Sequence, residues 1–212
     1  MDPAANPQQS PTPALPPLLD ALRQVLERRS RSYTTPRVRS QRRAAGVLVL
    51  FYERKGELAI VFFKRTEKVP THKGQVAFPG GSGDPGDRDL EDTALREANE
   101  ELGIDPSRVV MLGPLQPFDT YISNFMVSPF CGYLLDADPK FEPQPFEVEE
   151  VFEVPLSKLR DKRYRHRGKV PGFNIPIPLP YFKIDGAVIW GASGGVLQEL
   201  LEALDEADAA SA

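Results

Sequence analysis

Three glutamates near the middle of the chain have the spacing of a metal site. Glu97, Glu100 and Glu101 belong to the run REANEELGI, which is typical of a short helix that ends at Gly103. Residues four apart on a helix are neighbours, with Cβ atoms about 6 Å apart, so Glu97 and Glu101 stack and Glu100 lies beside them. Such like-charge pairs destabilise a helix by about 0.2–0.5 kcal/mol each. The cluster is either a solvated acidic face or a set of oxygen ligands for Mg²⁺ or Mn²⁺.

A glycine-rich turn precedes this helix. The segment FPGG (78–81) closes an expected strand, and its glycines let the backbone approach a ligand and leave a carbonyl free for a metal. Three aspartates follow within residues 84–89. A calcium loop of the EF-hand type fails to explain them, because Arg88 falls where an oxygen ligand is needed and Pro85 disrupts the loop.

Short apolar runs on both sides of the turn predict the strands that must position it. Residues 46–52 and 58–63 predict a hairpin of buried strands joined by a charged turn. Asp89 is the expected N-cap of the acidic helix, and Gly103 is its expected left-handed terminal residue. We expect further strands at 108–114, 126–135 and 150–154 and within 172–190, and amphipathic helices at 17–29 and around 196–204. Strands in irregular alternation with a few helices indicate an α+β fold with a sheet packed between helices.

The length of 212 residues suits one domain with additional segments. We expect a disordered Pro-rich tail over 1–16, a short helix and basic linker over 17–43, the main domain over 44–205 and a carboxyl-terminal tail over 206–212. The linker region carries seven arginines and no acid between Arg28 and Arg43. Such a stretch is either a solvated linker or a contact for a polyphosphate, a nucleic acid or an acidic partner.

Composition narrows the class of protein. The chain has no run of about 18 apolar residues, and its amino terminus lacks the basic and apolar regions of a secretory signal. Cys131 is the only cysteine, and its apolar neighbours suggest an inert core thiol. A disulfide within one chain is excluded, so a reducing cytoplasm is the expected setting. We expect a cytoplasmic monomer or homodimer that acts on a small molecule, with no nucleic-acid or membrane partner.

The combined pattern resembles the signature of the Nudix hydrolases. That signature is a glycine, five residues, a glutamate, seven residues, and then Arg-Glu-apolar-X-Glu-Glu-X-Gly-apolar. The second half matches in full from Arg96 to Ile104. In the first half, Gly81 is followed after five residues by Asp87 instead of glutamate, and eight residues then separate Asp87 from Arg96. The resemblance spans about residues 44–205 and implies an α/β/α sandwich with a mixed sheet between helices.

A second element resembles one branch of that family, the coenzyme A pyrophosphatases. The run HKGQVAFPGG (72–81) looks like their upstream motif, and KRT (64–66) and IWGAS (189–193) also fit. Pro70 stands where many members carry an arginine. The substrate-binding residues implied by this likeness are Arg65, His72, Lys73, Gly74, Gln75, Phe78, Pro79 and Gly80.

The resemblance implies a metal-dependent hydrolysis of coenzyme A or its derivatives to 3′,5′-ADP and 4′-phosphopantetheine or its acyl form. Alternatives are another nucleoside diphosphate, such as ADP-ribose, a dinucleoside polyphosphate or NADH, or a catalytically silent module that senses a ligand or partner. By the same resemblance, Glu97 and Glu101 are the principal metal ligands, Glu100 serves a second ion and the Gly81 carbonyl contributes. Arg96 is expected to pair with a helix carboxylate and fix its rotamer.

The resemblance leaves the general base open between two groups of glutamates. Glu97 and Glu100 are the candidates on the helix, and Glu147, Glu149 and Glu150 are the candidates on a downstream loop. We favour Glu150, because it directly precedes an expected strand.

Two further groups of residues have both a functional and a structural interpretation. The basic segment 160–169 can reach the 3′-phosphate of coenzyme A or form a solvated hairpin. Tyr121, Phe125 and Tyr164 can line an adenine or pantetheine pocket or belong to the core. Lys68 is a further candidate cation near the glycine-rich turn.

Overall fold

The computed structural model describes residues 14–33, 43–120, 124–170 and 176–211. Residues 1–13 of the expected tail, residues 34–42 of the basic linker and Tyr121 lie outside these ranges.

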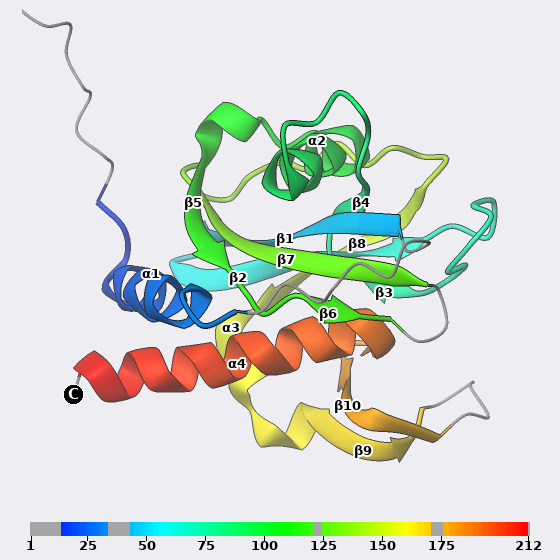
Figure 1. The fold of residues 1–212 in the computed structure, drawn as a ribbon. Helices are drawn as coiled ribbons and strands as arrows, with labels where there is room; N and C mark the ends of the chain where they lie inside the picture. The colour runs from blue at the N-terminus through cyan, green and yellow to red at the C-terminus, as the bar shows by residue number, and fades with distance from the viewer. Residues whose placement is uncertain (1–13, 34–42, 121–123, 171–175, 212) are drawn as a thin grey trace, which may run out of the picture.

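Two long strands that come early in the chain form the centre of a mixed sheet (Figure 1). β1 (Arg43–Arg54) and β2 (Glu57–Arg65) form the expected antiparallel hairpin, with Phe51 opposite Ile60. β7 (Phe125–Leu134) lies parallel to β1. The other strands of this sheet are β3 (Val76–Ala77), β4 (Gly80–Ser82), β5 (Val109–Pro114), β6 (Phe118–Asp119) and β8 (Val148–Pro155). The order is β3-β2-β1-β7-β5, while β4 pairs with β1, β6 with β7 and β8 with β2.

One face of this sheet is covered by α2 (Leu90–Leu102) (Figure 1). Side chains of a strand alternate between the two faces, so Leu48 and Leu50 of β1 point to the same side. Both are fully buried in a cluster that includes Ala94 and Ala98 of α2. The small alanine side chains allow the helix to lie close to the sheet, and its glutamates are thereby held near β1 and β4.

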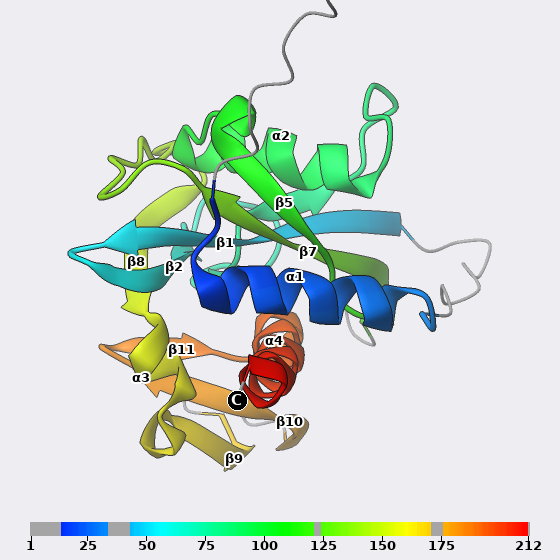
Figure 2. The same ribbon diagram turned by 90° about the vertical axis from the view of Figure 1, so that its left-hand side faces the viewer.

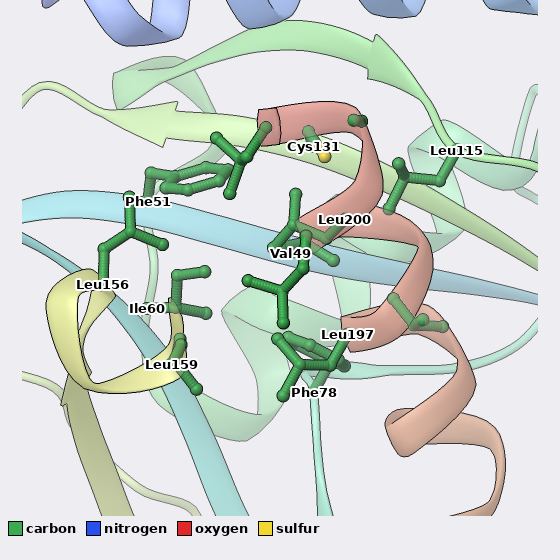
Figure 3. Close-up of a cluster of buried hydrophobic side chains, with 14 of the residues drawn as sticks. Val49, Phe51, Ile60, Phe78, Leu115, Cys131, Leu156, Leu159, Leu197 and Leu200 are labelled. Carbon is green, nitrogen blue, oxygen red and sulfur yellow. The ribbon is translucent and has the colours of Figure 1, made fainter. Parts of the chain in front are cut away.

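The opposite face is covered by α1 (Pro17–Ser30) and α4 (Gly191–Ser211) (Figures 1 and 2). The alternate β1 residues, Val49 and Phe51, extend into this second core, where Leu200 of α4 meets them (Figure 3). Burying apolar side chains of this size stabilises the fold by about 1.5–3 kcal/mol each. The sheet between helices confirms the predicted α+β class.

The terminal helices are also joined by ion pairs. Arg29 of α1 lies 2.9 Å from Glu199 and 2.6 Å from Glu206, both on α4. Ala207 is fully buried. Because its last turns have these partners, α4 runs on to Ser211, through residues that the sequence interpretation assigned to a tail. The helix expected over 17–29 is confirmed as α1.

A small antiparallel sheet lies beside α4 (Figure 1). It consists of β9 (Arg165–Lys169), β10 (Pro176–Ile184) and β11 (Ala187–Ile189), and it follows the short helix α3 (Leu156–Arg160). Single 3₁₀ turns occur at Pro106–Arg108 and Lys162–Tyr164. Within the described ranges, no helix has the length and apolar character needed to cross a membrane.

Candidate metal and pyrophosphate site

Both ends of α2 are fixed by the residues that the sequence suggested. The Asp89 carboxylate accepts a hydrogen bond from the Asp92 backbone N–H at 2.9 Å. Gly103 has φ 69°, and its N–H donates to the Asn99 carbonyl at 2.8 Å. A left-handed residue at this place suits glycine because it has no Cβ. The helix therefore begins and ends so that its glutamate-bearing side lies next to β4.

Glu101 is the most deeply placed of the three glutamates. It is 2% exposed, and its Oε2 accepts a hydrogen bond from the Gly80 N–H at 2.9 Å. Its Oε1 lies 3.3 Å from Nη1 of Arg65. Burial raises the pKa of Glu101 to about 8, although the Gly80 N–H and Arg65 act in the opposite direction. A carboxylate whose charge is disfavoured by burial gains stability when a cation binds it.

Glu97 lies one helical turn away and faces the glycine turn. A Cβ atom added to Gly81 would be 2.5 Å from Cδ of Glu97, so any larger residue here would push the Glu97 carboxylate aside. Burial raises the pKa of Glu97, and its contact with Arg96 at 2.9 Å opposes that shift. The structure therefore brings together Glu97, Glu101 and the Gly80–Gly81 backbone, as the sequence predicted.

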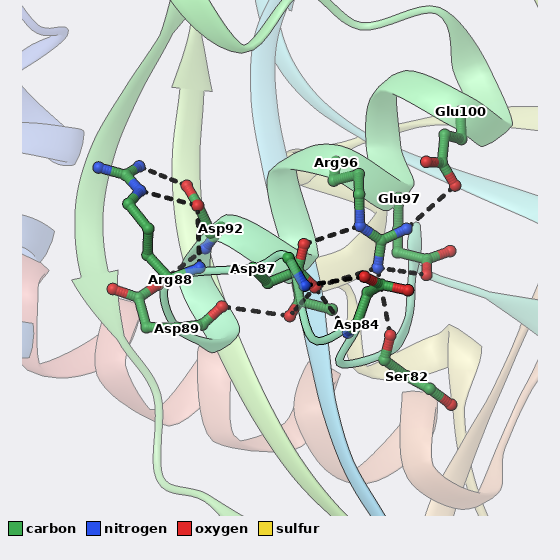
Figure 4. A network of polar contacts seen from close by, with 11 residues as sticks. Ser82, Asp84, Asp87, Arg88, Asp89, Asp92, Arg96, Glu97 and Glu100 are labelled. Atoms are coloured by element: carbon green, nitrogen blue, oxygen red, sulfur yellow. Dashed lines mark hydrogen bonds and ion pairs between the residues drawn. The ribbon is translucent and has the colours of Figure 1, made fainter.

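Arg96 connects the helix to the preceding loop (Figure 4). Its Nε donates to Oδ1 of Asp87 at 2.9 Å, and Nη2 donates to the Ser82 carbonyl at 3.2 Å. It also contacts two glutamates that follow it in the helix, Glu97 at 2.9 Å and Glu100 at 3.0 Å. Arg96 thus pairs with helix carboxylates as expected and additionally binds the loop.

Asp87 is the loop partner that sequence reasoning did not assign. Besides Arg96, it accepts hydrogen bonds from Thr93 Oγ1 at 2.7 Å and from the Asp84 N–H at 2.9 Å. Arg96 is the main reason that the pKa of Asp87 lies far below its usual range. The shorter carboxylate and the extra loop residue are accommodated in this way, with Asp87 fastening the loop to α2. In the sequence, the sign of this contact is the acidic residue that precedes Arg96.

Glu100 is the most exposed of the three glutamates. Its side chain is 58% exposed and is held by Arg96. Across the described residues, no three His, Cys, Asp or Glu side chains gather closely enough to hold a metal ion. The chemistry of the donors nevertheless fits a hard divalent ion, because Glu97, Glu101 and the Gly81 carbonyl supply oxygen only.

The loop glutamate next to this pair is Glu147. Its carboxylate lies 3.6 Å from Nη2 of Arg65, and its charge contributes to the raised pKa values of Glu97 and Glu101. Glu150, which the sequence interpretation favoured as general base, lies exposed on β8 opposite Lys64.

The pairing of β2 and β8 explains this placement. Glu150 faces Lys64, and a shift in register after this pair brings Val148, in place of Glu149, opposite Arg65. An irregularity of this kind leaves no clear mark in a sequence. Glu149 forms an ion pair with Lys64 at 2.6 Å. In the portion of the chain that the structure describes, no contact joins Glu150 to Glu97 or Glu101.

Residues 72–75 form a tight turn against β2. His72 and Gly74 have φ values of 57° and 64°, and the His72 ring contacts the Gln75 side chain at 3.0 Å. The Gly74 N–H donates to the Arg65 carbonyl at 3.1 Å. Lys73 is exposed at the tip. This turn is thus attached to the strand end that carries the Arg65–Glu101 contact.

Two residues expected to bind substrate are buried. Phe78 is 3% exposed, and its ring lies 4.5 Å from that of Phe62. The Pro79 carbonyl accepts a hydrogen bond from the Leu48 N–H at 2.8 Å. The chain passes here between β3 and β4 at the face covered by α4, so both side chains are buried. The Phe78 side chain thus has a place in the core, and the role of this residue in substrate binding stays a prediction.

The remaining candidates have structural partners. Tyr164 packs against the core around α4, and Phe125 lies beneath the Arg43 guanidinium at 5.2 Å. In the basic segment, Arg160 pairs with Asp208 and Arg163 with Asp161. The His166 ring stacks on Tyr181 at 5.2 Å.

Known proteins resemble the part of the chain that contains these residues. Residues 41–171 match the sequence model of the NUDIX domain. The "Uncharacterized Nudix hydrolase NudL" of Pectobacterium atrosepticum is 34% identical over 174 residues, which cover 77% of this chain and 83% of that protein. "Nudix hydrolase 15, mitochondrial" of Arabidopsis thaliana is 36% identical over 164 residues, 74% of this chain and 56% of that protein.

Among solved structures, the NUDIX domain of Shewanella oneidensis NrtR complexed with ADP ribose is 21% identical and has a TM-score of 0.45. That alignment covers 62% of this chain and 83% of the NrtR chain. The domain match and the relatives above 30% identity show that this chain belongs to the Nudix hydrolase family.

Proposed function

We propose that this protein hydrolyses the pyrophosphate bond of coenzyme A or its derivatives, giving 3′,5′-ADP and 4′-phosphopantetheine or the acyl form. The observation that carries this proposal is the contact of Glu101 with both Gly80 and Arg65. Through these contacts, the two segments that resemble the coenzyme A branch, 64–66 and 72–81, adjoin the glutamate pair of the Nudix signature.

Nudix hydrolases generally use divalent metal ions, and we propose Mg²⁺ or Mn²⁺ for this protein. Glu97, Glu101 and the Gly81 carbonyl would hold the first ion, and Glu100 would serve a second. When bound, such ions neutralise the phosphate charge and lower the pKa of water.

The chain's own groups position these ligands. Arg96 holds the rotamers of Glu97 and Glu100, and Asp87 in turn holds Arg96. For the proton of the attacking water, the geometry favours Glu147 over Glu150 among the loop glutamates, because only Glu147 lies beside Arg65. A general base must lie within hydrogen-bond reach of the water or one water further away.

The substrate is tested by turnover of coenzyme A and of ADP-ribose at equal concentration with Mg²⁺ or Mn²⁺. We expect faster release of 3′,5′-ADP from coenzyme A than of AMP from ADP-ribose. Cleavage of ADP-ribose alone would reject coenzyme A in favour of another nucleoside diphosphate. Turnover of neither compound, nor of dinucleoside polyphosphates or NADH, would favour a silent module.

The contacts by which Asp87 joins the loop to α2 lead to a second prediction. Asp87→Asn should lower kcat/KM by about 10- to 100-fold, because partners that orient metal ligands typically contribute that much. The amide keeps one acceptor for Arg96 but loses the charge. Asp84→Asn is the matched control, since the Asp84 carboxylate accepts a hydrogen bond from the Gly86 N–H of its own loop and makes no contact with Arg96 in the described part of the chain. Equal kcat/KM values for the two variants would contradict the role of Asp87.

We further propose a cytoplasmic location and a monomer or homodimer. The single cysteine, Cys131, is buried and unpaired, which suits a reducing compartment. Cell fractionation and light scattering would test the location and the oligomeric state.

A further inference from the structure

One aromatic side chain beside the glutamate pair is left in solvent. Phe146 is 55% exposed, and among the residues that the structure describes it is the only large hydrophobic side chain in this state. The same loop carries Phe141, whose ring packs edge-on against Tyr52 with 5.4 Å between centroids. The loop therefore has one aromatic that anchors it to the core and a second that contributes nothing to the core.

The main chain around Phe146 is fastened to the site from two sides. The Gln144 N–H donates to the Glu101 carbonyl at 2.9 Å. Thr66 Oγ1 donates to the Phe146 carbonyl at 2.6 Å, and the Thr66 N–H donates to the Glu147 carbonyl at 2.9 Å. A side chain on a backbone that is already ordered loses little further entropy when a ligand packs on it.

The residue that follows Phe146 in the chain belongs to the charged groups of the site. The next residue, Glu147, lies 3.6 Å from Nη2 of Arg65, and Nη1 of Arg65 lies 3.3 Å from Glu101. Ligand sites commonly combine an apolar or aromatic surface with a few polar groups that fix orientation. A substrate whose phosphates lie at Glu97 and Glu101 has its flat, uncharged part available for such a surface.

We propose that Phe146 is a specificity-determining residue whose ring stacks on the nucleobase of the substrate. The inference rests on the proposed function only in requiring a substrate that carries a nucleoside diphosphate. Every base has a π-face, so an exposed phenyl ring accepts adenine without hydrogen bonds to its edges. The ring would select for nucleotides against pyrophosphates that lack a base.

The test is steady-state kinetics of Phe146 variants with coenzyme A and with ADP-ribose, both of which contain adenine. Phe146→Ala should raise KM about tenfold with kcat within about twofold, because stacking on a base contributes to binding at this scale. Phe146→Tyr should keep the wild-type KM. Phe146→Leu is the matched control, because it keeps apolar bulk and lacks the aromatic face, so its KM should follow that of Phe146→Ala.

A binding measurement makes the inference independent of turnover. AMP should quench the fluorescence of Phe146→Trp beyond any change in the wild-type protein, whose only tryptophan is Trp190. Wild-type KM values for Phe146→Ala, together with no added quenching in Phe146→Trp, would overturn the stacking role. A wild-type KM for Phe146→Leu would overturn it as well, because the contact would then need no ring.

The two proposals fail in different ways. If coenzyme A is not cleaved but AMP quenches Phe146→Trp, the proposed substrate is wrong and the stacking role stands. If coenzyme A is cleaved with the same KM by every variant, the substrate stands and the stacking role is wrong.

Discussion

Replacing Glu101 with glutamine is expected to abolish pyrophosphate hydrolysis while the protein stays folded. The amide has the shape of the carboxylate and can still accept from the Gly80 N–H, so the local backbone keeps its partner. It carries no charge, however, and a neutral amide is a weak ligand for a hard cation. We expect kcat/KM to fall by more than about a hundredfold, or about 2.7 kcal/mol of transition-state stabilisation.

The control for this loss is Glu150→Gln. Glu150 lies exposed on β8, and it should keep activity within about twofold of wild type if its side chain has no part in the chemistry. Full activity of Glu101→Gln would mean that the metal assignment is wrong. Loss of activity in Glu150→Gln would restore Glu150 as the general base.

Glu101→Gln should also change how the stability of the metal-free protein depends on pH. Burial raises the pKa of Glu101 to about 8, from 4.5 for an unperturbed glutamate. A folded-state pKa above the unfolded value means that this group's stabilising contribution is complete below about pH 4.5 and is lost as the pH rises towards 8. Glutamine does not titrate.

With a chelator present, the melting temperature of wild type should therefore fall more between pH 5 and pH 8 than that of Glu101→Gln. Thermal unfolding of both proteins at the two pH values measures this difference. Added Mg²⁺ should raise the wild-type melting temperature at pH 8 and leave that of the variant nearly unchanged, because a ligand stabilises the state that binds it. Parallel pH dependences would contradict the effect of burial on Glu101.

The helix and its ends were predictable from the sequence because they depend on neighbouring residues. Asp89 accepts from a residue three positions on, and Gly103 adopts the left-handed conformation that ends a helix. The stacking of Glu97 and Glu101 follows from the helical repeat alone. The hairpin of β1 and β2 was equally local, since both strands are apolar runs joined by a short turn.

What the sequence did not reveal depends on contacts between distant segments. The pairing of β2 with β8 places Glu150 opposite Lys64, and the Arg65 side chain reaches Glu147 beyond the start of β8. Phe78 lies next to the glycine turn in sequence, but its side chain is buried in the core. It directly follows β3, and side chains along a strand alternate between the two faces of the sheet. The contacts of Arg96 with Asp87 on the loop likewise join residues that are nine positions apart.

Gly46→Ala is expected to destabilise the fold strongly while leaving the charged groups of the site intact. A Cβ atom at Gly46 would lie 2.1 Å from the carbonyl oxygen of Leu90 and 3.0 Å from the backbone nitrogen of Ala94. Both atoms belong to the backbone of α2, so no side-chain rotation relieves the clash. The helix must move away from β1 and lose contact with Leu48.

Overpacking of a core costs about 1–3 kcal/mol and occasionally more, and a backbone clash belongs at the upper end. For a protein of this size, about 3 kcal/mol lowers the melting temperature by roughly 6–12 °C. Gly83→Ala is the matched control, because its Cβ would meet Leu90 Cδ2 at an ordinary 3.6 Å. Thermal unfolding compares the two, and equal melting temperatures would show that α2 does not need to lie so close.

Because Gly46 pairs with Gly81 across β1 and β4, a displaced helix also separates Glu97 from the glycine turn. Gly46→Ala should therefore lose activity even at temperatures where it remains folded.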